Sequence, residues 1–87
     1  MDKYPLYLGG NEKGSLTVTR EGLMTCFFAQ CERQNGIVRL YIFGDGKKAY
    51  LGTMQPDDKG LYLRKRLSRA ELSSFPQKIA YAADAPT

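Results

Sequence analysis

Apolar and polar residues alternate in short runs along most of the chain. In residues 15–20, Leu16 and Val18 alternate with three hydroxyl-bearing residues, so one side of the segment is apolar and the other polar. This period of two is typical of a β-strand with one buried face. Similar runs recur at short intervals, and glycine-rich turns separate them. Short strands with such regular spacing predict an all-β sandwich or barrel.

Strand patterns cover most of the sequence. Six strands are expected over residues 4–8, 15–20, 23–31, 37–43, 49–54 and 61–67, and a seventh over 78–82. Both alternating sides of 23–31 are apolar, with Leu23 and Phe27 sharing one side, which predicts a central strand. Asn35-Gly36 tolerates the positive φ angles of a tight hairpin turn, so 37–43 is expected to pair with 23–31.

A helix start interrupts the strand pattern near the C-terminus. Ser68-Arg69-Ala70-Glu71 matches the capping box, in which the serine accepts from a first-turn N–H and the glutamate reaches back. A short helix from Arg69 to about Ser74 should follow and stop near Phe75-Pro76, because a residue before proline disfavours helix. Residues 84–87 are expected to form a tail.

Length and composition limit the fold to one small domain. The chain has 87 residues, of which 43% are hydrophobic and 25% charged, as in an ordinary folded protein. We therefore expect a single β domain over residues 1–87. It should contain six to seven mainly antiparallel strands, as a sandwich or a partly open barrel, with one short helix.

The net charge bears on the partners of the protein, and the N-terminus bears on its location. The formal net charge of +4 mildly favours anionic partners, because a positive field raises their encounter rate. No apolar run is long enough to span a membrane. The N-terminus lacks the apolar stretch of a secretory leader, so a cytoplasmic location and no membrane partner are expected.

The two cysteines are expected to be free and buried. Cys26 and Cys31 lie five residues apart in one expected strand, which places their side chains on opposite faces about 16 Å apart. A disulfide needs Cα atoms closer than about 7 Å. Free buried thiols fit a reducing compartment.

The sequence offers little for catalysis. It contains no histidine, the commonest general base and a common metal ligand. Cys26 and Cys31 lie among apolar neighbours that keep a thiol inert. Asp57-Asp58 lacks the spacing of a calcium loop, and the glycine-rich turns lack the lysine and helix of a phosphate loop. We expect a protein that is not an enzyme and uses no metal or cofactor.

The strongest candidate for a binding site is a cationic strand. Residues 61–69 carry four positive charges and no negative one. On a strand, Tyr62, Arg64 and Arg66 project from one face about 7 Å apart, an arrangement that can stack on bases and pair with phosphates. The candidate binding residues are Tyr62, Arg64, Lys65, Arg66 and Arg69, with Arg39 and Tyr41 as a second row if their strand lies nearby. The alternative is a solvated edge strand, whose charges prevent aggregation.

Tyrosine is unusually abundant for so small a core. An exposed row of tyrosines could bind a peptide or sugar rings, although tyrosine is also a common strand residue with one wet end. No tryptophan is present to form the usual sugar platform. The six tyrosines are Tyr4, Tyr7, Tyr41, Tyr50, Tyr62 and Tyr81.

One short pattern occurs twice. Tyr7-Leu8-Gly9 followed by Lys13-Gly14 resembles Tyr50-Leu51-Gly52 followed by Lys59-Gly60. The pattern fits a duplicated strand-turn-strand unit, but any series of strands with glycine turns gives the same pattern, and we favour this simpler explanation.

In the second half of the chain, a strand, a Pro/Gly loop and a second strand precede an Arg-Leu-Ser-Arg-Ala run. The residues of this pattern are Tyr50-Leu51-Gly52, Pro56, Gly60, Leu61, Leu63 and Arg66 to Leu72. The pattern resembles that of small bacterial proteins of unassigned function. The resemblance implies a bacterial origin and no particular activity, cofactor or substrate.

Two functions follow as hypotheses. The first is a non-enzymatic cytoplasmic binding module that uses a sheet face or strand edge to engage a protein partner or a second copy of itself. The alternative is single-stranded nucleic-acid binding through the basic strand face.

Overall fold

Eight strands and one short helix make up the computed structural model, which describes residues 1–84. The expected all-β class with one short helix is confirmed, with slightly more strands than expected. In chain order the elements are β1 (Asp2–Leu8), β2 (Asn11–Glu21), β3 (Met24–Cys31), β4 (Arg39–Gly44), β5 (Lys47–Thr53), β6 (Gln55–Pro56), β7 (Leu61–Ser68), α1 (Arg69–Leu72) and β8 (Tyr81–Asp84).

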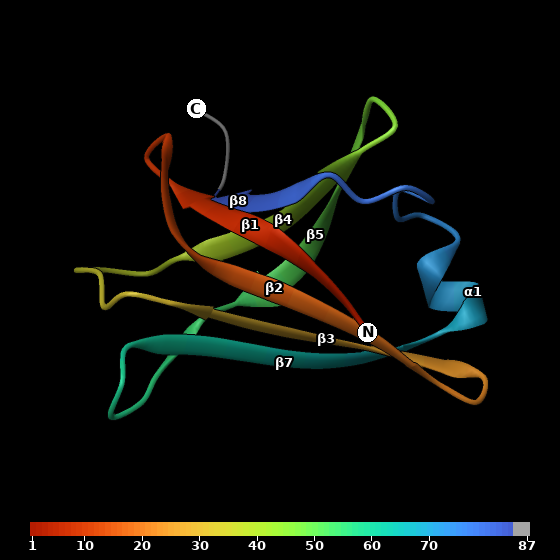
Figure 1. Cartoon of the computed structure of the whole chain (residues 1–87), viewed down its shortest axis with the longest axis horizontal. Helices are drawn as coiled ribbons and strands as arrows, with labels where there is room; N and C mark the ends of the chain where they lie inside the picture. The colour runs from red at the N-terminus through yellow and green to blue at the C-terminus, as the bar shows by residue number, and fades with distance from the viewer. Residues whose placement is uncertain (85–87) are drawn as a thin grey trace.

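The eight strands form one sheet that curls into a nearly closed barrel (Figure 1). Their order is β5-β4-β8-β1-β2-β3-β7-β6, so β5 and β6 lie at opposite ends of the sheet. These two strands are consecutive in the chain, with only Met54 between them. The backbone N–H of Met54 donates to the carbonyl of Val38, 2.9 Å away. A barrel, and not a sandwich, results because one stretch of chain borders both ends of the sheet.

The central position expected for β3 is confirmed, but the expected hairpin between β3 and β4 does not form. The two edges of β3 pair with β2 and β7, while β4 pairs with β5 and β8. Gly36 has the positive φ of a turn residue, +83°. A turn at Asn35-Gly36 therefore exists, but both edges of β3 are already occupied when the chain leaves it.

The last strand, β8, lies between β1 and β4. Its pairing with β1 is parallel, and every other strand pair in the described sheet is antiparallel. Asp84, expected to begin a C-terminal tail, is the last residue of β8, and the rest of that tail lies outside the described residues.

Alternate residues of the longer strands fill the barrel interior. The largest fully buried side chains are Phe27, Leu6, Leu16, Leu40, Ile42 and Leu51. Burying each such side chain contributes about 1.5 to 3 kcal/mol, which makes this layer the main source of stability. Leu23 was expected to share one side of the strand with Phe27, but it lies in the turn before β3 and is 80% exposed. Thr25 takes the inner position next to Phe27 instead.

The helix and the loop after it cover one end of the barrel (Figure 1). The predicted capping box is present: the Ser68 hydroxyl accepts from the Glu71 N–H, and the Glu71 carboxylate accepts from the Ser68 N–H. The helix ends at Leu72, before the expected Ser74. Phe75 then packs against Phe27, with ring centroids 5.8 Å apart, and closes this end of the core.

Two glycines allow the strands beside β3 to approach it closely. A Cβ at Gly14 would collide with the carbonyl oxygen of Gln30, and a Cβ at Gly60 would collide with that of Cys31. These glycines belong to the two copies of the repeated pattern, but the copies differ in structure: β1 and β2 form a hairpin, whereas β5 pairs with β4. Lys13-Gly14 and Lys59-Gly60 thus share a local role, since the glycine of each pair allows a strand to pack closely against the end of β3.

Gly14→Ala should destabilise the barrel. The added Cβ meets backbone, which cannot rotate away, so we expect a loss of about 2 to 3 kcal/mol in the free energy of unfolding. The neighbouring Ser15→Ala variant should stay within about 0.5 kcal/mol of the parent. Urea unfolding measures both, and equal midpoints for the two variants would contradict the close approach of β2 to β3.

Candidate binding surfaces

The cationic strand β7 has the two sides that the sequence predicts. Leu61, Leu63 and Leu67 are buried in the barrel. Arg64 and Arg66 point outward and are exposed, and Tyr62 on the same side is half-buried. The outer side of β7 therefore presents one aromatic ring and two guanidinium groups to solvent.

Arg64 is positioned by a phenylalanine on the neighbouring strand. Phe28 of β3 is the cross-strand partner of Arg64, and the guanidinium carbon lies over its ring, 5.1 Å from the centroid. A cation over an aromatic face at this distance is attracted by the ring electrons. Both residues line a shallow hollow on the outer surface, together with Cys26 and Arg66.

Arg66 lies beside a thiol and a carboxylate. The Cys26 thiol donates to Oε1 of Glu21 at 2.7 Å, and Cys26 is the cross-strand partner of Arg66. Interaction with the Cys26 side chain, followed by the negative charge of Glu21, raises the pKa of Arg66. The guanidinium is therefore positively charged and has a carboxylate nearby.

The cysteines are both free, as expected, but only one is buried. Cys31 faces the core, where burial and then the charge of Glu32 raise the pKa of its thiol. Cys26 is half-buried on the outer face, a correction to the expectation that both thiols are buried. Their positions on opposite faces of β3 follow from their odd spacing.

Arg39, Tyr41 and Arg69 do not join the row on β7. Arg39 and Tyr41 point outward from β4. At the seam of the barrel, where the two ends of the sheet meet, β5 lies between β4 and β7. Arg69 is the first residue of α1, beyond the end of the strand. The expected second row is therefore on a separate part of the surface.

Lys65 occupies an inner position of β7 but is exposed. It lies between buried Leu63 and Leu67, opposite the buried Phe27. Within the described sheet, β6 pairs only with Leu61 and Tyr62, so the edge of β7 beyond Tyr62 has no strand partner on that side. A lysine directed inward at an open edge hinders pairing with a strand of another molecule.

Lys65 also influences the start of the helix. The pKa of the Glu71 carboxyl is lowered first by its hydrogen bonds with Ser68, and then by the positive charge of Lys65. The position and charge of Lys65 are therefore accounted for by the open edge of β7 and by the helix cap. Lys65 is not part of the row formed by the outward-facing Arg64 and Arg66.

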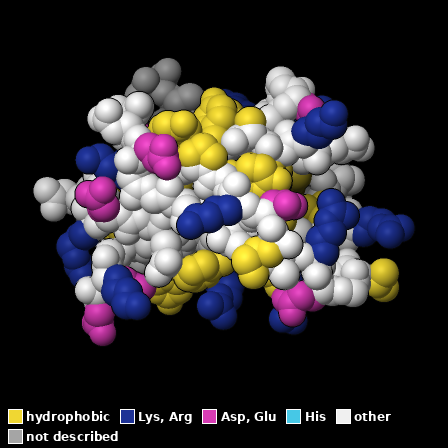
Figure 2. Space-filling view, viewed as in Figure 1, with side chains coloured by type: hydrophobic (Ala, Val, Ile, Leu, Met, Phe, Trp, Pro, Cys, Tyr) yellow, Lys and Arg dark blue, Asp and Glu magenta, His cyan; other side chains and the backbone are white. Residues whose placement is uncertain are grey.

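A second surface lies on the other half of the barrel. Five aromatic side chains project outward from β1, β8, β4 and β5, and ring centroids of neighbours lie 5.0 to 5.6 Å apart. Tyr50 is 49% and Tyr81 36% exposed. Figure 2 shows hydrophobic side chains gathered over β8 and β1. We call this surface the aromatic face; its members are Tyr7, Tyr41, Phe43, Tyr50 and Tyr81.

Cations border the aromatic face. Lys47 and Lys48 share a hollow with Phe43 and Tyr81 at the turn between β4 and β5. The Asp45 carboxylate in this turn already accepts the N–H of Lys78, at 2.8 Å. The lysines therefore supply the available charge beside the rings.

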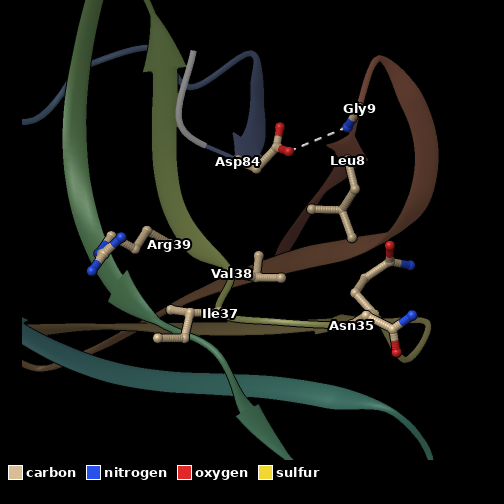
Figure 3. A pocket seen from close by; sticks show the side chains of 8 residues that line it. Leu8, Gly9, Asn35, Ile37, Val38, Arg39 and Asp84 are labelled. Atoms are coloured by element: carbon tan, nitrogen blue, oxygen red, sulfur yellow. Dashed lines mark hydrogen bonds between the residues drawn. The ribbon is translucent and has the colours of Figure 1, made fainter. Parts of the chain in front are cut away.

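An open pocket lies at the barrel end opposite α1, between the β1–β2 turn and the loop before β4 (Figure 3). The Asp84 carboxylate at its rim accepts the N–H of Gly9 at 3.3 Å. Val38 and Leu8 line its apolar part, while Arg39 points to the opposite side of β4. Its one carboxylate is already engaged with backbone, so the pocket presents no acid–base pair.

The sequence analysis missed three residues of these surfaces. Phe28 and Phe43 are outward-facing aromatics, and Lys3 is the cross-strand partner of Thr17, on the row that leads to Phe28 and Arg64. The period of two placed Phe43 on the same side as Tyr41, so Phe43 could have been found. Lys3 and Phe28 could be assigned to this surface only from the order of the strands in the sheet.

No family model, curated protein or solved structure matches the chain. Within residues 1–84, no three histidine, cysteine or acidic side chains are grouped closely enough to hold a metal ion. The same residues include no helix with the length and apolar character to cross a membrane.

Lys65→Val should make the chain self-associate. Valine at this position completes an apolar inner side on β7 and leaves its edge free to pair with another strand. Light scattering after size-exclusion chromatography should give a larger mass for Lys65→Val than for the parent at equal concentration. Arg64→Val, one residue away but outward-facing, should leave the mass unchanged. Equal masses for all three proteins would show that the edge is protected in another way.

Proposed function

We propose that this protein is a non-enzymatic cytoplasmic interaction module that binds an acidic segment of a partner protein on the aromatic face. The observation that carries the proposal is the gathering of five outward-facing rings, in two packed groups, on four adjacent strands. Small monomeric proteins usually scatter their exposed apolar side chains, and apolar side chains gathered on one face mark an interaction site. The free thiols are compatible with a reducing compartment.

The rings are suited to binding because they hold one another in place. Tyr81 packs edge-on against Tyr7, at 83° between planes, and stacks on Phe43 at 10°. Tyr41 packs against Tyr50, whose hydroxyl lies 2.9 Å from that of Thr53. Side chains that are already ordered lose little conformational entropy when a ligand binds.

The size of the patch favours a short segment over a second copy of the chain. A tyrosine or phenylalanine side chain can bury about 150 to 250 Å², and even the most exposed ring is only 49% accessible. Five such rings expose a few hundred Å² at most, against about 800 Å² per partner in a standard stable interface.

The charge favours an acidic ligand. The chain carries a net charge of +4, so two copies repel each other. Lys47 and Lys48 border the rings, while the carboxylates of Asp45 and Asp84 are engaged with backbone N–H groups. An acidic segment with an apolar or aromatic anchor complements this surface in both shape and charge.

A selection of short random peptides displayed on phage tests this proposal. We expect the peptides enriched on the parent protein to be acidic and to contain apolar or aromatic residues. A synthetic copy of the best peptide should bind the Tyr50→Ser/Tyr81→Ser double variant at least about thirtyfold more weakly, because truncation of a hot-spot aromatic residue costs about 2 kcal/mol or more. Fluorescence anisotropy measures the affinities.

Tyr62→Ser is the matched control, because it removes a tyrosine from the other half of the barrel. It should bind the peptide as the parent does. The proposal is wrong if the double variant binds the peptide normally, or if the enriched peptides are basic. It is also wrong in its choice of ligand if the parent is a dimer that the double variant converts to a monomer.

A further inference from the structure

The outer face of β2, β3 and β7 carries a second group of side chains, on the other half of the barrel from the aromatic face. Cross-strand partners point to the same side of a sheet, so the strand register defines rows across this face. One row runs from Lys3 through Thr17 and Phe28 to Arg64. Three steps of about 4.8 Å between strands place Lys3 roughly 14 Å from Arg64.

The neighbouring rows consist mainly of polar residues, and their side chains on β2 are short. Ser15, Gln30 and Tyr62 form the row on one side, and Thr19, Cys26 and Arg66 form the row on the other. Short hydroxyl groups on β2 leave room for a ligand to lie close to the sheet. We define the basic face as Lys3, Phe28, Tyr62, Arg64 and Arg66.

From this arrangement we infer that the basic face binds single-stranded nucleic acid. Phe28 and the guanidinium of Arg64 over it provide a stacking surface for an unpaired base. Lys3, on β1 beyond Thr17, and Arg66, two residues along β7 from Arg64, are placed to contact phosphates. The inference rests on different residues from the proposed peptide site.

The basic face presents different groups from the aromatic face. Both edges of β3 are paired, with β2 and with β7, so a ligand meets only side chains. Cations surround one stacked pair on this face, whereas several rings lie together on the aromatic face. The basic face therefore suits a phosphate backbone with an unpaired base better than a peptide with apolar anchors.

One acidic group limits the strength of the site. Glu21 lies beside Cys26 and Arg66 and repels phosphates at that end of the hollow. The path of a strand should therefore run along the Lys3-to-Arg64 row and pass Arg66 on its side away from Glu21. This predicts modest affinity that depends strongly on salt.

Titration of the protein with fluorescein-labelled oligo-dT and oligo-U at several salt concentrations tests the inference. With Arg66 and Lys3 in contact with phosphates, the logarithm of the binding constant should fall with the logarithm of salt concentration with a slope of about 1.4. The Arg64→Gln/Arg66→Gln double variant should reduce this slope to about 0.7 and weaken binding. Both arginines are exposed, so the variant should keep the circular dichroism spectrum of the parent.

Two control variants separate this site from general electrostatic attraction. Lys47→Gln/Lys48→Gln removes the same charge from the other half of the barrel and should leave the affinity within about twofold of the parent, with the slope unchanged. Lys65→Gln, on β7 but not on its outer side, should do the same. If either control weakens binding as much as the arginine variant, the basic face is not the site.

A change without loss of charge tests the stacking surface. Phe28→Leu should weaken binding at least about fivefold while the salt slope stays the same, because base stacking contributes independently of phosphate contacts. The inference is overturned if no oligonucleotide binds at low salt. It is also overturned if duplex DNA or poly-glutamate binds as tightly as oligo-dT, since either result indicates attraction to charge alone. The aromatic-face variant Tyr50→Ser/Tyr81→Ser should bind oligo-dT normally, so this inference and the proposed peptide binding can fail independently.

Discussion

The barrel depends on the stretch Lys47–Pro56, which borders both ends of the sheet. Its first part pairs with β4, and its last two residues pair with β7. Met54 between them is buried, and its backbone N–H donates a hydrogen bond to the carbonyl of Val38. Gly52 allows the ends to meet, since a Cβ there would lie 3.2 Å from the Leu63 side chain. Pairing across the seam stops at Tyr62, and the open edge beyond it explains why a lysine occupies an inner position of β7.

Closure of the sheet also separates the two outer surfaces. Once alternate residues fill the interior, the remaining positions on β5, β4, β8 and β1 bring rings together, whereas those on β2, β3 and β7 carry hydroxyls and guanidiniums. β1 contributes to both, with Tyr7 near one end and Lys3 near the other. The two proposed ligands would therefore occupy separate halves of the barrel and could be bound together.

The sequence predicted local features well, because they depend on neighbouring residues. The period of two assigned the outer side of β7, and the capping box located α1. Pairing over long distances was less predictable. Asn35-Gly36 has hairpin chemistry, yet β3 pairs with β7, whose residues lie 30 to 44 positions away from their partners in the chain. The sequence suggested an exposed row of tyrosines, but not which rings lie together, since the pairing of Phe43 with Tyr81 joins β4 to the distant β8.

The place of β8 has a consequence for how the protein is made. β1 and β4 are not direct neighbours in the sheet, and among residues 1–84 the strand Tyr81–Asp84 lies between them and pairs with both. Until these residues leave the ribosome, the nascent chain can form the β1–β2–β3 meander and the β4–β5 hairpin but not the barrel. Contacts between such distant segments form slowly, and the incomplete sheet exposes unpaired edges in the meantime. Premature termination before β8 should therefore yield a chain prone to aggregation and proteolysis.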